Sequence, residues 1–210
     1  MSNQRIVVTA LGDSISAGLP GWSPDPAERK ARGANTVESQ WEYWAERADS
    51  RLVIHNHGVG RQRADEIAAR LDKAAHGSDV LVVQGGLNNI VQGLSPESAA
   101  KDLRWMVRRG KELGLGVVLA DVLPWNNGPP GTIELIAELN TFIREIGQQE
   151  EVKVLPFHAT LEDPDRPGFM APSWTAEGNH PSVEGHRRLG ELAFSLPPAF
   201  ATPSPASSNA

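Results

Sequence analysis

Five short apolar stretches, each followed by a turn and then by a helical pattern, constrain the fold of this chain most strongly. They cover Ile6–Leu11, Leu52–His55, Asp79–Gln84, Val117–Asp121 and Val152–Leu155. Apolar runs of this length are typical of strands buried on both faces of a sheet. Because helical patterns separate them, we expect the strands to run parallel, with right-handed crossovers and helices on both faces. The sequence therefore predicts an α/β fold.

Helical periodicity is clear between the predicted strands. The segment 63–75, for example, places Ala64, Ile67 and Leu71 on one face and charged residues on the other. Two long segments lack such a pattern and are predicted as irregular, except for one helical turn over 26–32. The predicted helices cover 36–48, 63–75, 96–113, 132–149 and 182–193, and the irregular segments cover 15–35 and 156–179.

The size and composition favour one domain. The chain has 210 residues, of which 40% are hydrophobic, and this is enough for a single packed core. Beyond Leu196 the composition changes to Pro, Ala and Ser, which bury little apolar surface. We therefore expect one domain over residues 1–196 and a disordered tail over 197–210.

Charge and composition exclude several classes of partner. The formal net charge is −6 without a basic cluster, whereas nucleic acids and anionic membranes attract concentrated Lys and Arg. The chain has no cysteine, and its His and carboxylate residues lack metal-ligand spacing such as His-x-x-x-His. Neither a signal-peptide pattern nor an apolar run of about 20 residues is present. We expect a cytoplasmic protein without metal or cofactor, and the sequence leaves its oligomeric state open.

The turn after the first predicted strand carries a candidate nucleophile. Gly12-Asp13-Ser14 stands there, and α/β sheets bind ligands beyond the carboxyl ends of their strands. Ser14 suits nucleophilic attack, but an Asp-Ser pair before a helix often serves only as an N-cap. A further alternative is a non-catalytic domain in which Gly12–Gly18 binds a phosphate, although the usual phosphate-loop and dinucleotide motifs are missing.

A serine nucleophile requires a base and a group that orients the base. His180 is the best candidate base because it lies just before a predicted helix and follows Glu177 by three residues. On a tight turn that carboxylate would hold one ring nitrogen while the other faces Ser14. An exposed Glu and a helix-start His without catalytic roles are the alternative, and His57 and His158 are weaker candidates for the base.

Acyl transfer also requires hydrogen-bond donors for the developing oxyanion. Asn88 follows the central predicted strand and offers a side-chain amide, although an Asx turn is the simpler interpretation of that residue alone. Backbone N–H groups of Ser14 and of the turn Gly58–Arg61 are further candidates.

The order of these motifs resembles the four sequence blocks of the SGNH (GDSL-type) hydrolases. The blocks are Gly12-Asp13-Ser14, Asn56-x-Gly58, Gly86-x-Asn88 and an acidic residue three before His180, and they span nearly the whole chain. The resemblance implies a three-layer α/β/α sandwich of flavodoxin-like type with a five-stranded parallel sheet. It also implies an esterase or lipase with a Ser14–His180 pair, Glu177 as acidic helper, and an oxyanion hole of Ser14, Gly60 or Arg61, and Asn88.

Three positions depart from the family pattern. Glu177 stands where the family usually has Asp, so Asp163 or Asp165 is an alternative acid and a Ser-His dyad is another. Asn89 replaces the Asp that usually follows Asn88. Arg61 occupies the register of the oxyanion glycine, with Gly60 one position earlier. We expect its guanidinium to point to solvent or to pair with an acidic neighbour, and the alternative is that it reaches the pocket and binds an anionic substrate group.

The substrate is expected to be a small carboxylic ester. No long apolar lid segment is present, which favours a short acyl group such as acetyl on a carbohydrate or small alcohol. An acyltransferase with the same residues is the alternative. The residues predicted to line the substrate pocket are Trp22, Asn89, Trp125 and Trp174.

Overall fold

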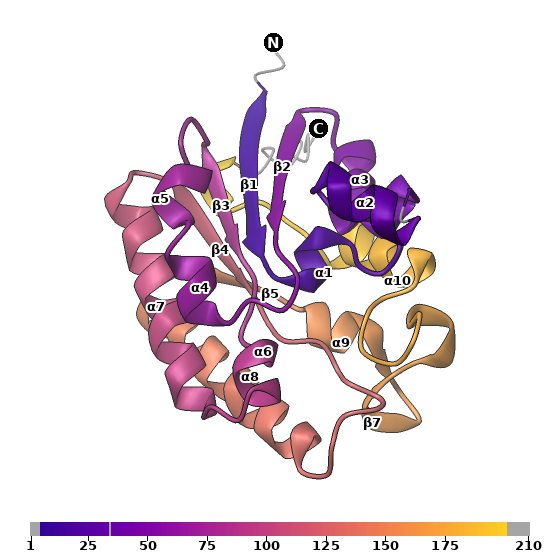
Figure 1. The fold of residues 1–210 in the computed structure, drawn as a ribbon. Coiled ribbons are helices and arrows are strands. Elements are labelled where there is room, and N and C mark those ends of the chain that lie inside the picture. The colour runs from indigo at the N-terminus through magenta and orange to yellow at the C-terminus, as the bar shows by residue number, and fades with distance from the viewer. Residues whose placement is uncertain (1–4, 34, 201–210) are drawn as a thin grey trace, which may run out of the picture.

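The computed structural model describes residues 5–33 and 35–200 and contains the predicted five-stranded parallel sheet (Figure 1). The strand order is β2-β1-β3-β4-β5. The order reverses between β1 and β3, and ligands bind at such a switch point in flavodoxin-like sheets. The strands are β1 (Ile6–Gly12), β2 (Leu52–Gly58), β3 (Val80–Val83), β4 (Gly116–Ala120) and β5 (Lys153–Leu155).

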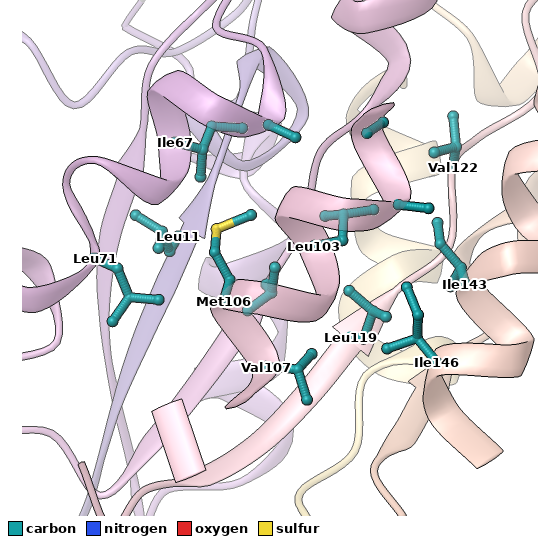
Figure 2. Close-up of a cluster of buried hydrophobic side chains, with 14 of the residues drawn as sticks. Leu11, Ile67, Leu71, Leu103, Met106, Val107, Leu119, Val122, Ile143 and Ile146 are labelled. Carbon is teal, nitrogen blue, oxygen red and sulfur yellow. The ribbon is translucent and has the colours of Figure 1, made fainter. Parts of the chain in front are cut away.

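Helices cover both faces of the sheet, so the predicted three-layer α/β/α architecture is confirmed. In β3, Leu81 and Val83 pack against one layer, and Val80 and Val82 pack against the other. Figure 2 shows the first of these two cores, where Met106 lies among the aliphatic side chains. That layer consists of α4 (Ala64–Ala68), α5 (Leu71–Ala74), α7 (Pro96–Glu112) and α8 (Thr132–Gln149). The other contains α1 (Ser14–Ala17), α3 (Trp41–Ala48), α9 (Phe157–Leu161), α10 (Val183–Arg188) and a π-helical turn, Leu189–Ala193.

Two predicted helices are interrupted by side chains that bind elsewhere. The helix expected over 36–48 is a 3-10 turn, Val37–Ser39, followed by α3, because Gln40 between them is extended and accepts a hydrogen bond from Asn56. The helix expected over 63–75 is divided into α4 and α5. Between these helices, the Arg70 guanidinium turns inward and donates to the carbonyls of His57 and Gly12. Tertiary hydrogen bonds thus override the helical periodicity.

The irregular segments contain short elements that lie near the carboxyl edge of the sheet. The helical turn expected over 26–32 is present as α2 (Pro26–Arg32). The segment 156–179 contains the antiparallel pair β6 (Glu162–Asp163) and β7 (Arg166–Met170) and the 3-10 turn Pro172–Trp174. Outside these two segments, a short helix that was not predicted, α6 (Leu87–Val91), follows β3.

The C-terminal segment is ordered further than the sequence indicates. Pro198–Phe200 forms a 3-10 turn, and the Phe200 ring lies so close to Gly116 that a Cβ there would stand 2.6 Å from it. The disordered tail predicted from Pro197 is therefore wrong for residues 197–200, because the aromatic ring packs on the sheet. Residues 201–210 lie outside the described residues.

The described helices include none that combines the length and the apolar character required to cross a membrane.

Two titratable side chains are buried in α10 and α3, which pack against each other. Neither ring nitrogen of His186 and neither carboxyl oxygen of Glu42 has a hydrogen-bond partner within residues 5–33 and 35–200. Burial, with a smaller contribution from His180, lowers the pKa of His186 to about 3. Burial also raises the pKa of Glu42 well above its ordinary value. His186 is therefore uncharged at neutral pH, and the Glu42 carboxyl keeps its proton to a higher pH than an ordinary glutamate.

We expect His186→Leu to make the fold less sensitive to acid. The unfolded chain protonates His186 at its ordinary pKa of 6.5, whereas the folded chain resists protonation down to about pH 3. The free energy of unfolding therefore falls by about 1.4 kcal/mol per pH unit below pH 6.5. The leucine variant has no group to protonate at this position, so its free energy of unfolding does not fall for this reason. Urea unfolding at pH 7 and pH 5 should show a relative gain of about 2 kcal/mol for the variant. His76→Leu, at an exposed position, is the control, and equal pH slopes for His186→Leu and wild type would contradict the prediction.

Candidate active site

Ser14 is the first residue of α1 and directly follows the turn at the end of β1. The N-cap is Asp13, whose Oδ1 accepts a hydrogen bond from the Ile15 N–H at 3.0 Å. Burial raises the pKa of the Asp13 carboxyl, although this hydrogen bond acts in the opposite direction. Capping is thus performed by the aspartate of the Gly-Asp-Ser turn, and the Ser14 hydroxyl remains available for another partner.

The serine turn is anchored to the end of β3 by Gln84. Its buried Oε1 accepts hydrogen bonds from the Ser16 hydroxyl at 3.1 Å and from the Asp13 N–H at 3.2 Å. Gly12 lies against these atoms: a Cβ there would approach Ser16 Oγ to 2.3 Å and Gln84 Oε1 to 2.5 Å. Only glycine fits this position, and the tight packing fixes the direction in which α1 leaves the sheet.

His180 and Glu177 lie beside Ser14. His180 Nε2 is 2.9 Å from Ser14 Oγ, and His180 Nδ1 is hydrogen-bonded to Glu177 Oε1. The imidazole side chain is 16% exposed and the Glu177 side chain 45% exposed, so the ring is shielded while the carboxylate contacts solvent. The structure therefore brings together the three residues that the sequence predicts as nucleophile, base and acid.

The turn that carries Glu177 and His180 is held on both sides. Within it, Thr175 Oγ1 accepts from the Gly178 N–H at 2.8 Å and donates to the His180 carbonyl at 3.0 Å. From the loop after β4, Asn127 Nδ2 donates to the Glu177 carbonyl at 2.9 Å. Gly178 has φ +101°, and a Cβ there would meet Asn127 at 2.8 Å, so glycine is required. The base is thus positioned by a rigid turn.

Asn88 lies in α6 at the switch point of the sheet. Its Nδ2 donates to the Gln62 carbonyl at 3.0 Å, and Asp13 Oδ2 is 3.5 Å away, the outer limit for a hydrogen bond. A primary amide has two N–H donors. The contact with Gln62 therefore orients the side chain, and the second N–H has only the long contact with Asp13.

Gly60 and Arg61 both reach the cavity at Ser14. A Cβ on Gly60 would lie 4.0 Å from Ser14 Cβ. Arg61 has φ +68°, which is the left-handed conformation that favours glycine. The chain thus adopts a glycine-like backbone at the family's glycine register although the residue is arginine. Which of the two N–H groups serves an oxyanion stays a prediction.

A cavity of about 520 Å³ opens above Ser14. Its walls combine apolar residues with charged residues from α2 and from the loops at the carboxyl edge. The lining residues include Leu19, Pro20, Glu28, Arg32, Leu87, Val91, Trp125 and Asn179, in addition to the six site residues described above.

Of the four residues predicted for the substrate pocket, Trp125 lines this cavity, and Trp22, Asn89 and Trp174 are not among its lining residues. Asn89 is buried, and its Oδ1 accepts from the Ala64 N–H at 2.9 Å, because it holds the start of α4. Trp22 lies under the Arg29 guanidinium at 4.4 Å. Trp174 packs in the core and lies under Arg188 at 3.9 Å.

The alternative bases and acids have other partners. His158 Nδ1 is 2.8 Å from the Val122 carbonyl, and Asp163 Oδ1 accepts from the backbone N–H of Asp165. Burial, followed by the positive charge of Arg70, lowers the pKa of His57, which does not line the cavity. Across residues 5–33 and 35–200, His, Asp and Glu side chains form no cluster of three that would hold a metal ion.

Several residues of the site carry no role in the sequence-based prediction. Gln84 was detectable as a polar residue that ends an apolar strand before two glycines. Asn127 lies in a loop whose sequence shows only turn composition. Glu28 and Arg32 reach the cavity from α2, and no local pattern indicates on which side of the sheet that helix lies.

A flavodoxin-like strand order with a Ser–His–Glu arrangement at the switch point is the architecture of a hydrolase. The chain belongs to the GDSL-like lipase/acylhydrolase family, whose model matches residues 10–188. The match covers the serine turn, the Asn88 segment and the His180 turn. Comparison with curated protein sequences returns no match.

Solved structures share the fold at low sequence identity. A protein from Desulfitobacterium hafniense DCB-2, assigned to the lipolytic G-D-S-L family, has a TM-score of 0.73 at 22% identity, covering 89% of this chain and 97% of that chain. A lipolytic G-D-S-L family protein from Veillonella parvula DSM 2008 has a TM-score of 0.70 at 17% identity, with 88% and 94% covered. AlinE4, an SGNH-hydrolase family esterase, has a TM-score of 0.58 at 22% identity, with 85% and 90% covered.

Proposed function

We propose that the protein is a serine esterase that hydrolyses carboxylic esters through a covalent acyl-Ser14 intermediate. The observation that carries this proposal is the 2.9 Å contact between Ser14 Oγ and His180 Nε2, with Glu177 on the opposite ring nitrogen. A hydroxyl becomes a competent nucleophile when a base accepts its proton as it attacks, and an oriented imidazole supplies that base near neutral pH.

In the first half-reaction the Ser14 oxygen attacks the ester carbonyl carbon while its proton moves to His180 Nε2. Glu177 accepts a hydrogen bond from Nδ1–H, which keeps Nε2 unprotonated before attack and stabilises the imidazolium afterwards. The carbonyl oxygen becomes an oxyanion. Its donors are the Ser14 N–H, the N–H of Gly60 or Arg61, and the second N–H of Asn88 Nδ2.

Collapse of this intermediate breaks the bond to the alcohol, which leaves with the proton from His180 Nε2. A water molecule then gives its proton to the same nitrogen and attacks the acyl carbon. A second oxyanion forms in the same place and collapses to release the carboxylic acid and restore the Ser14 hydroxyl. The net reaction consumes one ester and one water and yields one acid and one alcohol.

The lining of the cavity supports a short acyl group. Its apolar part consists of Leu19, Pro20, Leu87, Val91 and Trp125, and Glu28 and Arg32 from α2 add charge to the same lining, which disfavours a long apolar chain. The indole of Trp125 also offers a flat surface to a sugar ring or a small alcohol. We therefore favour acetyl and similar esters as substrates.

A series of p-nitrophenyl esters tests this function. We expect hydrolysis with kcat/KM highest for acetate to butyrate and about 10-fold or more lower for octanoate, because added methylenes meet charged groups instead of apolar surface. Release of free acid, measured beside p-nitrophenol, distinguishes hydrolysis from transfer to an added alcohol. Absence of ester cleavage across the series would contradict an esterase, and a steady rise of kcat/KM with chain length would contradict a short acyl group.

A further inference from the structure

Arg61 has a backbone conformation that its side chain disfavours. With φ +68° it is in the left-handed region, which is unfavourable for residues other than glycine. The conformation is held from outside, because Gln92 Nε2 donates to the Arg61 carbonyl at 3.1 Å. Strained residues cluster at functional sites, where the strain is part of the mechanism.

Arg61 is exposed and lines the cavity, and its guanidinium has no hydrogen bond or ion pair within residues 5–33 and 35–200. Nearby arginines differ in this respect. Arg32 pairs with Glu28 at 2.9 Å, and Arg63 pairs with Asp65 at 2.8 Å. The Arg70 guanidinium donates to two backbone carbonyls. Arg61 thus differs from these neighbours in keeping all its donors available.

The charges that line the cavity otherwise compensate one another. Glu28 is neutralised by Arg32, and Glu177 is engaged by His180. Among the charged residues of the lining, Arg61 is therefore the one whose side chain has no direct partner in residues 5–33 and 35–200. A guanidinium binds carboxylate or phosphate oxygens through two parallel N–H donors, which adds orientation as well as attraction.

We propose that Arg61 binds an anionic group, a carboxylate or phosphate, that the ester substrate carries. This inference rests on the proposed esterase function and specifies its substrate class: small esters with one negative charge beside the scissile bond. Binding of that charge orients the carbonyl against Ser14, so its effect appears mainly in kcat/KM.

Paired esters test the inference. On the alcohol side of the ester, 4-acetoxybenzoate carries a carboxylate and 4-acetoxybenzamide is its neutral analogue. A third ester, 4-acetoxyphenyl phosphate, carries a phosphate at the same position. On the acyl side, the p-nitrophenyl half-ester of adipic acid carries a free carboxylate, and its methyl ester is the neutral analogue. We expect wild type to prefer the charged member of at least one pair by about 10- to 100-fold in kcat/KM, after correction for alkaline hydrolysis.

The variant is Arg61→Gly, because glycine accepts φ +68° and preserves the backbone. The ratio of charged to neutral substrate is compared within each protein, so that any change in the oxyanion hole cancels. We expect the ratio to fall to about 1 in Arg61→Gly and to be partly kept in Arg61→Lys. Arg47→Gln, an exposed arginine over Tyr43 on α3, removes one charge elsewhere and should keep the wild-type ratio.

A binding measurement keeps this test independent of turnover. The uncleaved amides 4-acetamidobenzoate and 4-acetamidobenzamide are titrated calorimetrically into wild type and Arg61→Gly. If wild type binds the benzoate more tightly than the benzamide and Arg61→Gly loses this preference, the inference is supported, even if no ester is hydrolysed. Absence of ester hydrolysis would contradict only the esterase function. Ester hydrolysis without charge preference, or a preference that survives in Arg61→Gly, would overturn the role of Arg61 and leave the esterase function intact.

Discussion

Replacement of Ser14 by alanine is expected to lower kcat for p-nitrophenyl acetate by about 10⁶-fold, to the level set by the remaining oxyanion donors. The reason is chemical: without the Oγ that lies 2.9 Å from His180 Nε2, no acyl-enzyme can form. His180→Ala should have a similar effect, because an alcohol without a base is a poor nucleophile at neutral pH. Steady-state kinetics on purified variants measure both.

The two substitutions should also be strongly non-additive. Because Ser14 and His180 act as one unit, the double variant should be no slower than either single variant. Ser50→Ala, an exposed serine in the turn before β2, is the matched control and should retain full activity. Retention of more than about 1% of the wild-type kcat by Ser14→Ala, with a folded protein by circular dichroism, would contradict a serine nucleophile.

Glu177→Ala is expected to lower kcat by about 10²- to 10³-fold with little change in KM. Loss of the carboxylate frees Nδ1, so the ring populates the wrong tautomer and the imidazolium is less stabilised. The effect should be smaller than the roughly 10⁴-fold loss at a buried triad acid, because the Glu177 side chain is 45% exposed and water can partly replace it. Kinetics across pH 5–9 measure the loss.

A double-substitution cycle separates orientation of the base from a general structural effect. In a His180→Ala background, removal of Glu177 should have no further effect on kcat. Asp163→Asn, which alters a carboxylate at the β6–β7 turn that contacts a backbone N–H, should be nearly neutral for kcat. A loss of less than about threefold for Glu177→Ala would instead favour a Ser14–His180 dyad.

The global arrangement was predictable because it depends on rules that act over whole elements. Apolar runs separated by helices require parallel strands, and the carboxyl ends of parallel strands meet at one edge. This rule brings Ser14 and Asn88 together although they are far apart in sequence. For Ser14 and Asn88, which directly follow strands, the rule is sufficient, whereas His180 lies well beyond β5 and its pairing with Ser14 was indicated by the resemblance to the fourth sequence block of the family.

The details that sequence analysis missed depend on single tertiary contacts. Trp22 and Trp174 lie in loops near the site, but each is covered by an arginine from a neighbouring segment. Asn89 is adjacent to Asn88, yet one step along a helix turns its side chain to the start of α4. The left-handed backbone of Arg61 depends on support from Gln92. No local pattern encodes these partners.

The separation of 166 residues between Ser14 and His180 has a consequence for synthesis of the chain. A ribosome releases the nucleophile with the first strand, but the base and its acid emerge only after all five strands have been made. Contacts of such long range form late because the intervening chain must first be ordered. A nascent chain that stops before Thr175 therefore contains the serine without its base and is expected to lack ester-cleaving activity. If the proposed ester cleavage holds, activity reports that translation has passed the His180 turn and that this turn has docked beside Ser14.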